Sequence, residues 1–312
     1  MSPPRSSTSD TPFALATGVV LGGSLLASSA AIWIRFLPGV SPLAIGFIRT
    51  CGAAIIFFPW FWRQRIEQGL SWHDFRYSVM AGIALALHFA TWITSLRYTT
   101  VANSVLFVST HPMFVIAISL LILRIPVVRN QIVGALIALV GIIFIQWHDL
   151  DFSSSGGMFT GITLGNMLAL AGGFFGAVYL LLGREARKTL STVLHVEVTY
   201  ASAAVVLLCA AIFTKVQIAP PEAEAWLFLG LLILLPTVGG HTIFNWGVHH
   251  IGAPLVALFG LLEPVESALL ALIILGEGVG VTTIIGGGII LSGLSLAVWQ
   301  PGVRTPVPPS HV

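Results

Sequence analysis

Two long apolar stretches, each interrupted near its middle by an ionisable residue followed by proline, constrain the fold of this chain most. The first carries His111-Pro112, and the second carries Glu263-Pro264 at the equivalent place 152 residues later (111 to 263). Proline has no backbone N–H and disturbs a helix, which frees carbonyl oxygens one turn earlier. About 20 apolar residues suffice to cross a bilayer as a helix. We therefore expect two membrane helices that are broken at a polar centre by Pro112 and Pro264.

The composition extends this expectation to the whole chain. Apolar residues make up 56% of the 312 residues and charged ones only 8%, against roughly 45–50% and about 25% in ordinary soluble domains. This indicates an all-α integral membrane protein, and the connections between its apolar stretches are too short to hold a soluble domain. Ten stretches have spanning length: 13–34, 42–62, 75–95, 101–123, 128–147, 161–182, 193–213, 226–246, 254–275 and 281–299.

The two halves of the chain repeat. Gly22-Gly23 match Gly172-Gly173 at an offset of 150, and Gly134 and Gly141 match Gly286 and Gly293 at an offset of 152. A unit of five helices is odd, so the second unit enters the membrane from the opposite side, as in many transporters with inverted repeats. Chance matches in a glycine-rich chain are the alternative. The expected division is a disordered N-terminus at 1–12, a first repeat at 13–147, a linker at 148–160, a second repeat at 161–299 and a tail at 300–312.

The basic residues in the connections indicate the orientation. Loops on the side of the N-terminus hold ten Lys or Arg residues, and loops on the other side hold three. Cytoplasmic loops carry the excess of Lys and Arg. Both termini are therefore expected in the cytoplasm, with the 148–160 linker outside it.

Several loosely spaced motifs together resemble one transporter family. They are Ser41-Pro42 followed by Arg49, and the run from Pro264 through Leu275-Gly276-Glu277 to Gly286 and Gly293. With the two five-helix units, they resemble the drug/metabolite transporter superfamily, specifically its EamA-type exporters, over residues 13–299. One departure is that the Gly-Glu pair of the second half becomes Leu123-Arg124 in the first.

The resemblance implies a multi-pass protein of a bacterial inner membrane that exports small metabolites by alternating access. Amino acids, including aromatic and other apolar ones, are the expected substrates, and exporters of the YddG type are similar. Helices 1–4 would rock against helices 6–9, while helices 5 and 10 stand at the periphery.

The two carboxylates near the second helix break are the first candidates for a binding site. Glu263 and His111 each lie nine or ten residues into their spans, which is about 15 Å at 1.5 Å per residue and near the middle of a core about 30 Å thick. A charge there costs at least about 2.5–3.5 kcal/mol, so such residues usually face a cavity or a partner. Glu263 either binds a substrate amine or a coupling proton, or is neutral and hydrogen-bonded across the bundle. Glu266 follows one turn later on the same face.

Further polar and aromatic residues share helix faces with spacings of three or four. Such faces would suit a substrate with an amino-acid head and an apolar side chain, although buried packing is the alternative for each residue. His111 is either proton-sensitive or a satisfied buried histidine. The remaining candidates are His88, Trp92, His241, Asn245 and Tyr179.

Two charged residues have open alternatives as well. Arg49 lies about seven residues inside the second span and keeps its proton, so it must pair, reach the surface or meet water. It would capture a substrate carboxylate or pair with a backbone carbonyl or an acid. Glu197 is expected to form a salt bridge with the loop 184–188 rather than bind substrate.

Other function classes lack their usual patterns. The chain contains no His-Glu-x-x-His, no Gly-x-Ser-x-Gly and no Walker-type Gly-Lys loop, which speaks against an intramembrane enzyme. The basic residues are scattered over short loops, which disfavours nucleic-acid binding. We expect a non-enzymatic exporter without cofactor or metal, a monomer rather than a dimer, whose partners are a small solute, membrane lipid and a candidate coupling proton. An intramembrane enzyme, or an importer or facilitator of another small organic solute, is the alternative.

Overall fold

The computed structural model describes residues 11–99, 101–147, 161–220, 222–276 and 278–299, where all regular elements are helices. The first half contains α1 (Phe13–Ser28), α2 (Ala30–Arg35), α3 (Pro42–Gln68), α4 (Trp72–Ser95), α5 (Val101–Val108), α6 (His111–Leu121) and α7 (Arg129–Gln146). The second half contains α8 (Gly161–Ala186), α9 (Thr192–Phe213), α10 (Ala225–Leu232), the π-helical η1 (Ile233–His241), α11 (Thr242–Ile251), α12 (Ala253–Phe259), the 3-10 turn η2 (Gly260–Leu262), α13 (Glu263–Leu275) and α14 (Val281–Val298). The expected linker 148–160 and tail 300–312, and residues 1–10 of the expected N-terminal segment, lie outside the described residues.

Nine of the ten expected spans are long and apolar enough to cross a membrane, counted over the described residues. Consecutive elements such as α1 and α2, or α12 to α13, join into single spans. The remaining stretch forms a shorter apolar helix, Arg129–Ile145. The membrane class and the helical fold are therefore confirmed, and the tenth crossing stays a prediction.

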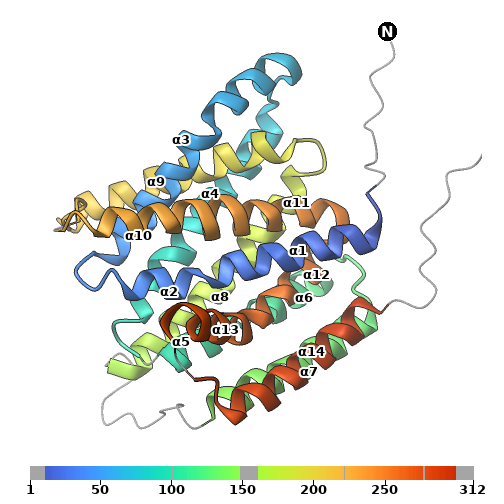
Figure 1. Cartoon of the computed structure of the whole chain (residues 1–312). Coiled ribbons are helices and arrows are strands. Elements are labelled where there is room, and N and C mark those ends of the chain that lie inside the picture. Colours follow the sequence, from blue (N-terminus) through green and yellow to red (C-terminus); the bar gives the residue numbers. More distant parts are fainter. Residues whose placement is uncertain (1–10, 100, 148–160, 221, 277, 300–312) are drawn as a thin grey trace, which may run out of the picture.

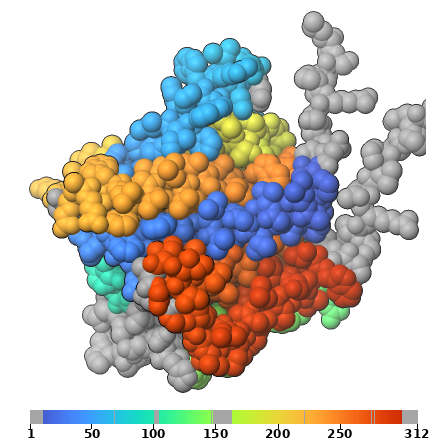
Figure 2. Space-filling model, in the orientation of Figure 1, coloured from blue at the N-terminus to red at the C-terminus, as the bar shows by residue number. Residues whose placement is uncertain are grey.

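The helices pair in a two-fold pattern (Figure 1). α1 packs on η1 and α11, just as its counterpart α8 packs on α4. Corresponding helices also meet each other: α3 with α9, α6 with α12, and α7 with α14. Figure 2 shows α1 lying against the span α10–α11 along its length. This is the pattern of two inverted copies related by an axis in the membrane plane, and it puts the two broken helices side by side.

The breaks occur where the two ionisable residues precede proline. α5 ends at Val108 and α6 begins at His111, while α12 ends at Phe259 and α13 begins at Glu263 after the 3-10 turn. Pro112 and Pro264 occupy the first turn of the new helix, where a missing N–H costs nothing because it would have no intrahelical partner. The predicted helix breaks are thus confirmed.

The matched glycines bring α7 and α14 into backbone contact at one edge of the molecule (Figure 1). A Cβ added at Gly141 would lie 2.7 Å from the Gly286 carbonyl oxygen, and one added at Gly286 would lie 2.8 Å from that of Gly141. Gly134 and Gly293 make the same reciprocal approach, so the two helices run antiparallel. Small residues allow such close packing in membranes.

Replacing Gly141 by Leu is expected to separate α7 from α14 and to lower the melting temperature of the detergent-solubilised protein. Overpacking of this kind costs about 1–3 kcal/mol. Gly288→Leu is the matched control on α14, because a Cβ there meets nothing within 4 Å. Equal melting temperatures for the two variants would contradict the proposed packing role.

Candidate functional site

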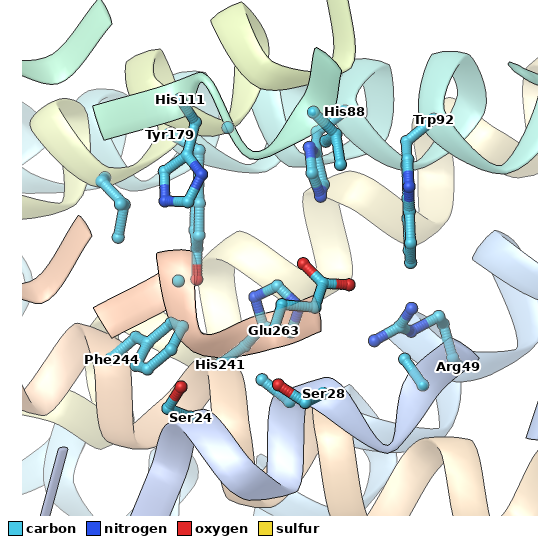
Figure 3. A pocket seen from close by; sticks show the side chains of 16 residues that line it. Ser24, Ser28, Arg49, His88, Trp92, His111, Tyr179, His241, Phe244 and Glu263 are labelled. Carbon is cyan, nitrogen blue, oxygen red and sulfur yellow. The ribbon is translucent and has the colours of Figure 1, made fainter. Parts of the chain in front are cut away.

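A cavity with about 730 Å³ of empty space, part of it open to solvent, lies between the two halves. Its wall combines α1 to α6 of the first half with α8, η1, α11, η2 and α13 of the second. Figure 3 shows the polar and aromatic side chains converging on it from opposite walls. They are Ser24, Ser28, Arg49, His88, Trp92, His111, Tyr179, His241, Phe244 and Glu263.

Most residues chosen from the sequence line this one cavity. The two that do not are Asn245, which lies one layer behind Tyr179, and Glu266, which lies one turn beyond Glu263. The structure adds lining residues that sequence reasoning did not single out, among them Ser24, Ser28 and Gly260. Small residues of this kind are common in membrane helices, so no local signal marked them. The lining residues that were predicted are Arg49, His88, Trp92, His111, Tyr179, His241 and Glu263.

The two neighbouring carboxylates have different surroundings. Glu266 Oε2 accepts hydrogen bonds from the Ser24 hydroxyl (2.8 Å) and the Ser28 hydroxyl (2.7 Å) of α1. Glu263 lines the cavity and makes no hydrogen bond to any residue in the described part of the chain. The reading of a carboxyl hydrogen-bonded across the bundle therefore fits Glu266 and was wrong for Glu263. Its carboxylate points into the cavity toward the wall that carries His88 (Figure 3).

Arg49 is fully buried on the opposite wall. Its Nε donates to the Thr237 hydroxyl oxygen (2.9 Å), and its guanidinium carbon lies 4.1 Å from the centre of the Phe89 ring. Both terminal nitrogens, Nη1 and Nη2, lack a hydrogen-bond partner among the described residues. The sequence-based alternative of a pair with an acid or a backbone carbonyl was therefore wrong. A buried guanidinium with two unused donor nitrogens has the groups needed to bind an anion.

The partner of Arg49 lies in a segment that sequence reasoning missed. Thr237 belongs to η1, a π-helix that contains Pro236, and its hydroxyl also donates to the Leu232 carbonyl oxygen (2.7 Å). The Thr237 carbonyl oxygen accepts a hydrogen bond from the Tyr200 hydroxyl (3.0 Å). π-helical turns often occur at functional sites. Pro236 and the pair Gly239-Gly240 were the available signals.

Histidine and aromatic side chains form the rest of the wall. His88 Nδ1 lies 2.8 Å from the Gly172 carbonyl oxygen, so it must donate, and the Nε2 of neutral His88 is left as an acceptor. The His88 ring stacks on Trp92 with a centroid distance of 5.9 Å. His111 lies against Gly260, where an added Cβ would be 2.9 Å from the imidazole Nε2. The two helix breaks are therefore in direct contact.

A buried layer of hydrogen bonds lies beside the cavity and joins four helices. Asn245 of α11 donates to the Tyr179 hydroxyl of α8, and its Oδ1 lies 3.1 Å from His195 Nε2 of α9. His195 Nδ1 lies 2.9 Å from the Ser78 hydroxyl of α4. Ser78, His195 and Asn245 are completely buried. Their contacts connect Tyr179 in the cavity wall to helices of both halves, which sequence reasoning did not foresee for His195.

The charged residues at the end of α8 and in the loop that follows it pair with one another. Glu185 binds both Arg184 (2.7 Å) and Lys188 (2.5 Å), and the Oε2 of Glu197 has no partner among the described residues. The expected salt bridge between Glu197 and this loop was therefore wrong. Arg187 donates to the carbonyl oxygens of Leu190 and Asn245, and burial lowers its pKa from 12.5 to about 10. It stays charged at neutral pH and fastens this loop to α11.

Comparison with known proteins agrees with the fold. A structure known from crystallography shares it with a TM-score of 0.72 and 18% identity, over 91% of this chain and 96% of the other. An "uncharacterized transporter" of Archaeoglobus fulgidus is 25% identical over 279 residues, covering 87% of this chain and 93% of the relative. The "uncharacterized transporter YyaM" of Bacillus subtilis is 24% identical over 227 residues, covering 71% and 72%.

The family comparison is more specific. The EamA-like transporter family matches the chain twice, over residues 14–147 and 163–299. Both matches coincide with the halves whose helices pair in the two-fold pattern. The chain therefore belongs to the EamA-like transporter family of the drug/metabolite transporter superfamily and is a membrane transporter.

Proposed function

We propose that the protein exports small metabolites, namely amino acids with aromatic and other apolar ones included, by alternating access from a cytoplasm that contains both of its termini. The excess of Lys and Arg in the loops on the N-terminal side supports this orientation. The proposed location is a bacterial inner membrane. The proposed unit is a monomer, and a proton is the candidate co-substrate.

One observation carries the choice of substrate: the cavity holds two unpartnered groups of opposite charge on different walls. Arg49 offers Nη1 and Nη2, and Glu263 offers a carboxylate. An amino-acid zwitterion would satisfy both groups, whereas a simple amine or acid would leave one of them unpaired. An unsatisfied buried charged group costs more than about 1–3 kcal/mol. The aromatic rings of Tyr179 and Phe244 suit an apolar side chain.

Alternating access requires that one end of the cavity closes while the other opens. The layer of Ser78, His195, Asn245 and Tyr179 crosses helices of both halves, so it would have to separate when the halves move. Tyr179 also lines the cavity, and a bound substrate that takes the Tyr179 hydroxyl would compete with Asn245. This supports a mechanism in which the first four spans rock against spans six to nine.

Reconstitution into proteoliposomes tests the proposal. We expect uptake of phenylalanine and leucine to exceed uptake of phenethylamine and phenylpropionate, which each lack one charged end. A pH gradient in one arm tests proton coupling. Recovery of the unchanged amino acid from the lumen would separate transport from an enzymatic activity. Equal uptake of the amine and the amino acid would contradict the zwitterion assignment.

His111→Ala is expected to reduce transport several-fold without unfolding the protein. The imidazole fills the space between the two helix breaks, against Gly260, and its removal leaves this contact open. The measurement is initial uptake at equal amounts of reconstituted protein. His73→Ala is the control, because His73 lies at the start of α4 with 60% of its side chain exposed. Unchanged uptake by the His111 variant would remove His111 from the proposed site.

A further inference from the structure

A second cavity lies on the flank of the molecule between α4, α6 and α8. It has about 950 Å³ of empty space, part of it open, and shares no lining residue with the central cavity. We call it the flank groove. Its apolar wall consists of Ile118, Leu123, Ile125, Val178, Leu181 and Leu182. Its rim consists of Tyr77, Arg184, Glu185 and Lys188.

The apolar wall and the charged rim follow each other along α8. From Val178 to Ala186, the last residue of α8, the helix advances about 12 Å at 1.5 Å per residue. The candidate membrane span in α8 ends at Ala186, so the charged rim lies at the end of that span and the apolar wall lies further inside it. A groove with this order matches the order of groups in a phospholipid, with the headgroup at the surface and the chains below.

The rim carries a net positive charge, because one carboxylate pairs with two cations. Glu185 bridges Arg184 and Lys188 at 2.7 Å and 2.5 Å, which leaves two cations against one carboxylate. The Lys188 side chain is 57% exposed, while those of Arg184 and Glu185 are 28% and 25% exposed. A pair with an exposed partner such as Lys188 contributes little to stability, with a median near 0–1 kcal/mol for exposed pairs. The phosphate of a bound ligand could therefore compete with the Glu185 carboxylate for Arg184 and Lys188.

From this arrangement we infer that the flank groove binds an anionic phospholipid, with its phosphate at Arg184 and Lys188 and an acyl chain along the wall from Leu182 to Val178. Basic pockets between membrane helices attract anionic headgroups in this way. A zwitterionic lipid carries its own cation near the phosphate, so it is attracted less strongly by Arg184 and Lys188. The inference does not depend on the proposed substrate.

The full chain in detergent tests the inference by native mass spectrometry with dioleoylphosphatidylglycerol, dioleoylphosphatidylcholine and glycerol phosphate. We expect the anionic lipid to bind most tightly and glycerol phosphate, which has no acyl chain, to bind least. The double variant Arg184→Gln/Lys188→Gln should lower the affinity for the anionic lipid by about fivefold for each cation removed. Glu185→Gln removes the competing carboxylate and should raise the affinity for the anionic lipid by a similar factor.

Arg63 and Glu67 provide matched controls, since they form an exposed ion pair on α3 outside the groove. Arg63→Gln and Glu67→Gln make the same charge changes and should leave the lipid preference as in the unmodified protein. The inference fails if the two lipids bind equally, if glycerol phosphate binds as well as the anionic lipid, or if the controls shift the preference as much as the groove variants do. Glu185→Gln is expected to raise the affinity, which a misfolded protein would not do. The inference therefore stays testable even if the double variant misfolds.

Discussion

Glu263→Gln is expected to lower amino-acid transport by at least tenfold while folding and membrane insertion stay largely intact. Glu263 is the one acidic side chain among the lining residues of the central cavity, and glutamine keeps its shape while removing its charge. A hydrogen bond to a charged group contributes about 1.5–3 kcal/mol, which corresponds to roughly a 10- to 100-fold change in affinity. The measurement is initial uptake into proteoliposomes at equal reconstituted protein, with Glu67→Gln as a surface control.

A counterflow assay separates the two roles that remain open for Glu263. If Glu263 binds the substrate amine, exchange of labelled for unlabelled amino acid should fall together with net uptake. If it carries a coupling proton, exchange should persist while accumulation driven by a pH gradient is lost. Full activity of Glu263→Gln in both assays would show that the carboxyl serves neither role.

Features that depend on local chemistry could be predicted from the sequence. The membrane class follows from hydropathy, and the helix breaks at Pro112 and Pro264 follow from the missing backbone donors. Ionisable residues inside a membrane usually face a cavity, and Arg49, His88 and Glu263 do so here. The glycines repeated at an offset of 152 were predicted as equivalent positions of the two halves, and the structure adds that they lie where α7 and α14 touch.

Features that depend on which helices meet could not be predicted in the same way. The unusual helix η1 forms where Thr237 meets Arg49 and Tyr200, contacts made between residues far apart in the chain. His195 gains its role only because α9 faces Ser78 of α4 and Asn245 of α11. Glu197 was assigned to the wrong partner, since Glu185 in the last turn of α8 pairs with both Arg184 and Lys188.

Arg49→Met is expected to reduce transport of amino acids by a hundredfold or more and to leave the melting temperature unchanged or higher. Methionine fills a similar volume without a charge, and replacing buried ionic groups by apolar ones is often neutral or stabilising by about 1–4 kcal/mol. The packing supports this outcome here. The Thr237 hydroxyl still donates to the Leu232 carbonyl oxygen when the Arg49 Nε is gone, and Phe89 would still pack against an apolar neighbour.

Measuring both transport and melting temperature separates a structural role of Arg49 from a role in substrate binding. A structural arginine would lower the melting temperature by several degrees when removed, since breaking a needed buried network costs about 3–5 kcal/mol. Replacing a substrate-binding arginine would not lower the stability in this way, because Nη1 and Nη2 of Arg49 bind no described residue. Arg49→Lys sharpens the comparison, since lysine keeps the charge but not the forked donors. It should impair transport of phenylalanine more than transport of phenethylamine, which has no carboxylate for Arg49 to bind. A less stable Arg49→Met protein with normal transport would assign Arg49 to the fold and leave the carboxylate of the substrate without a partner in this cavity.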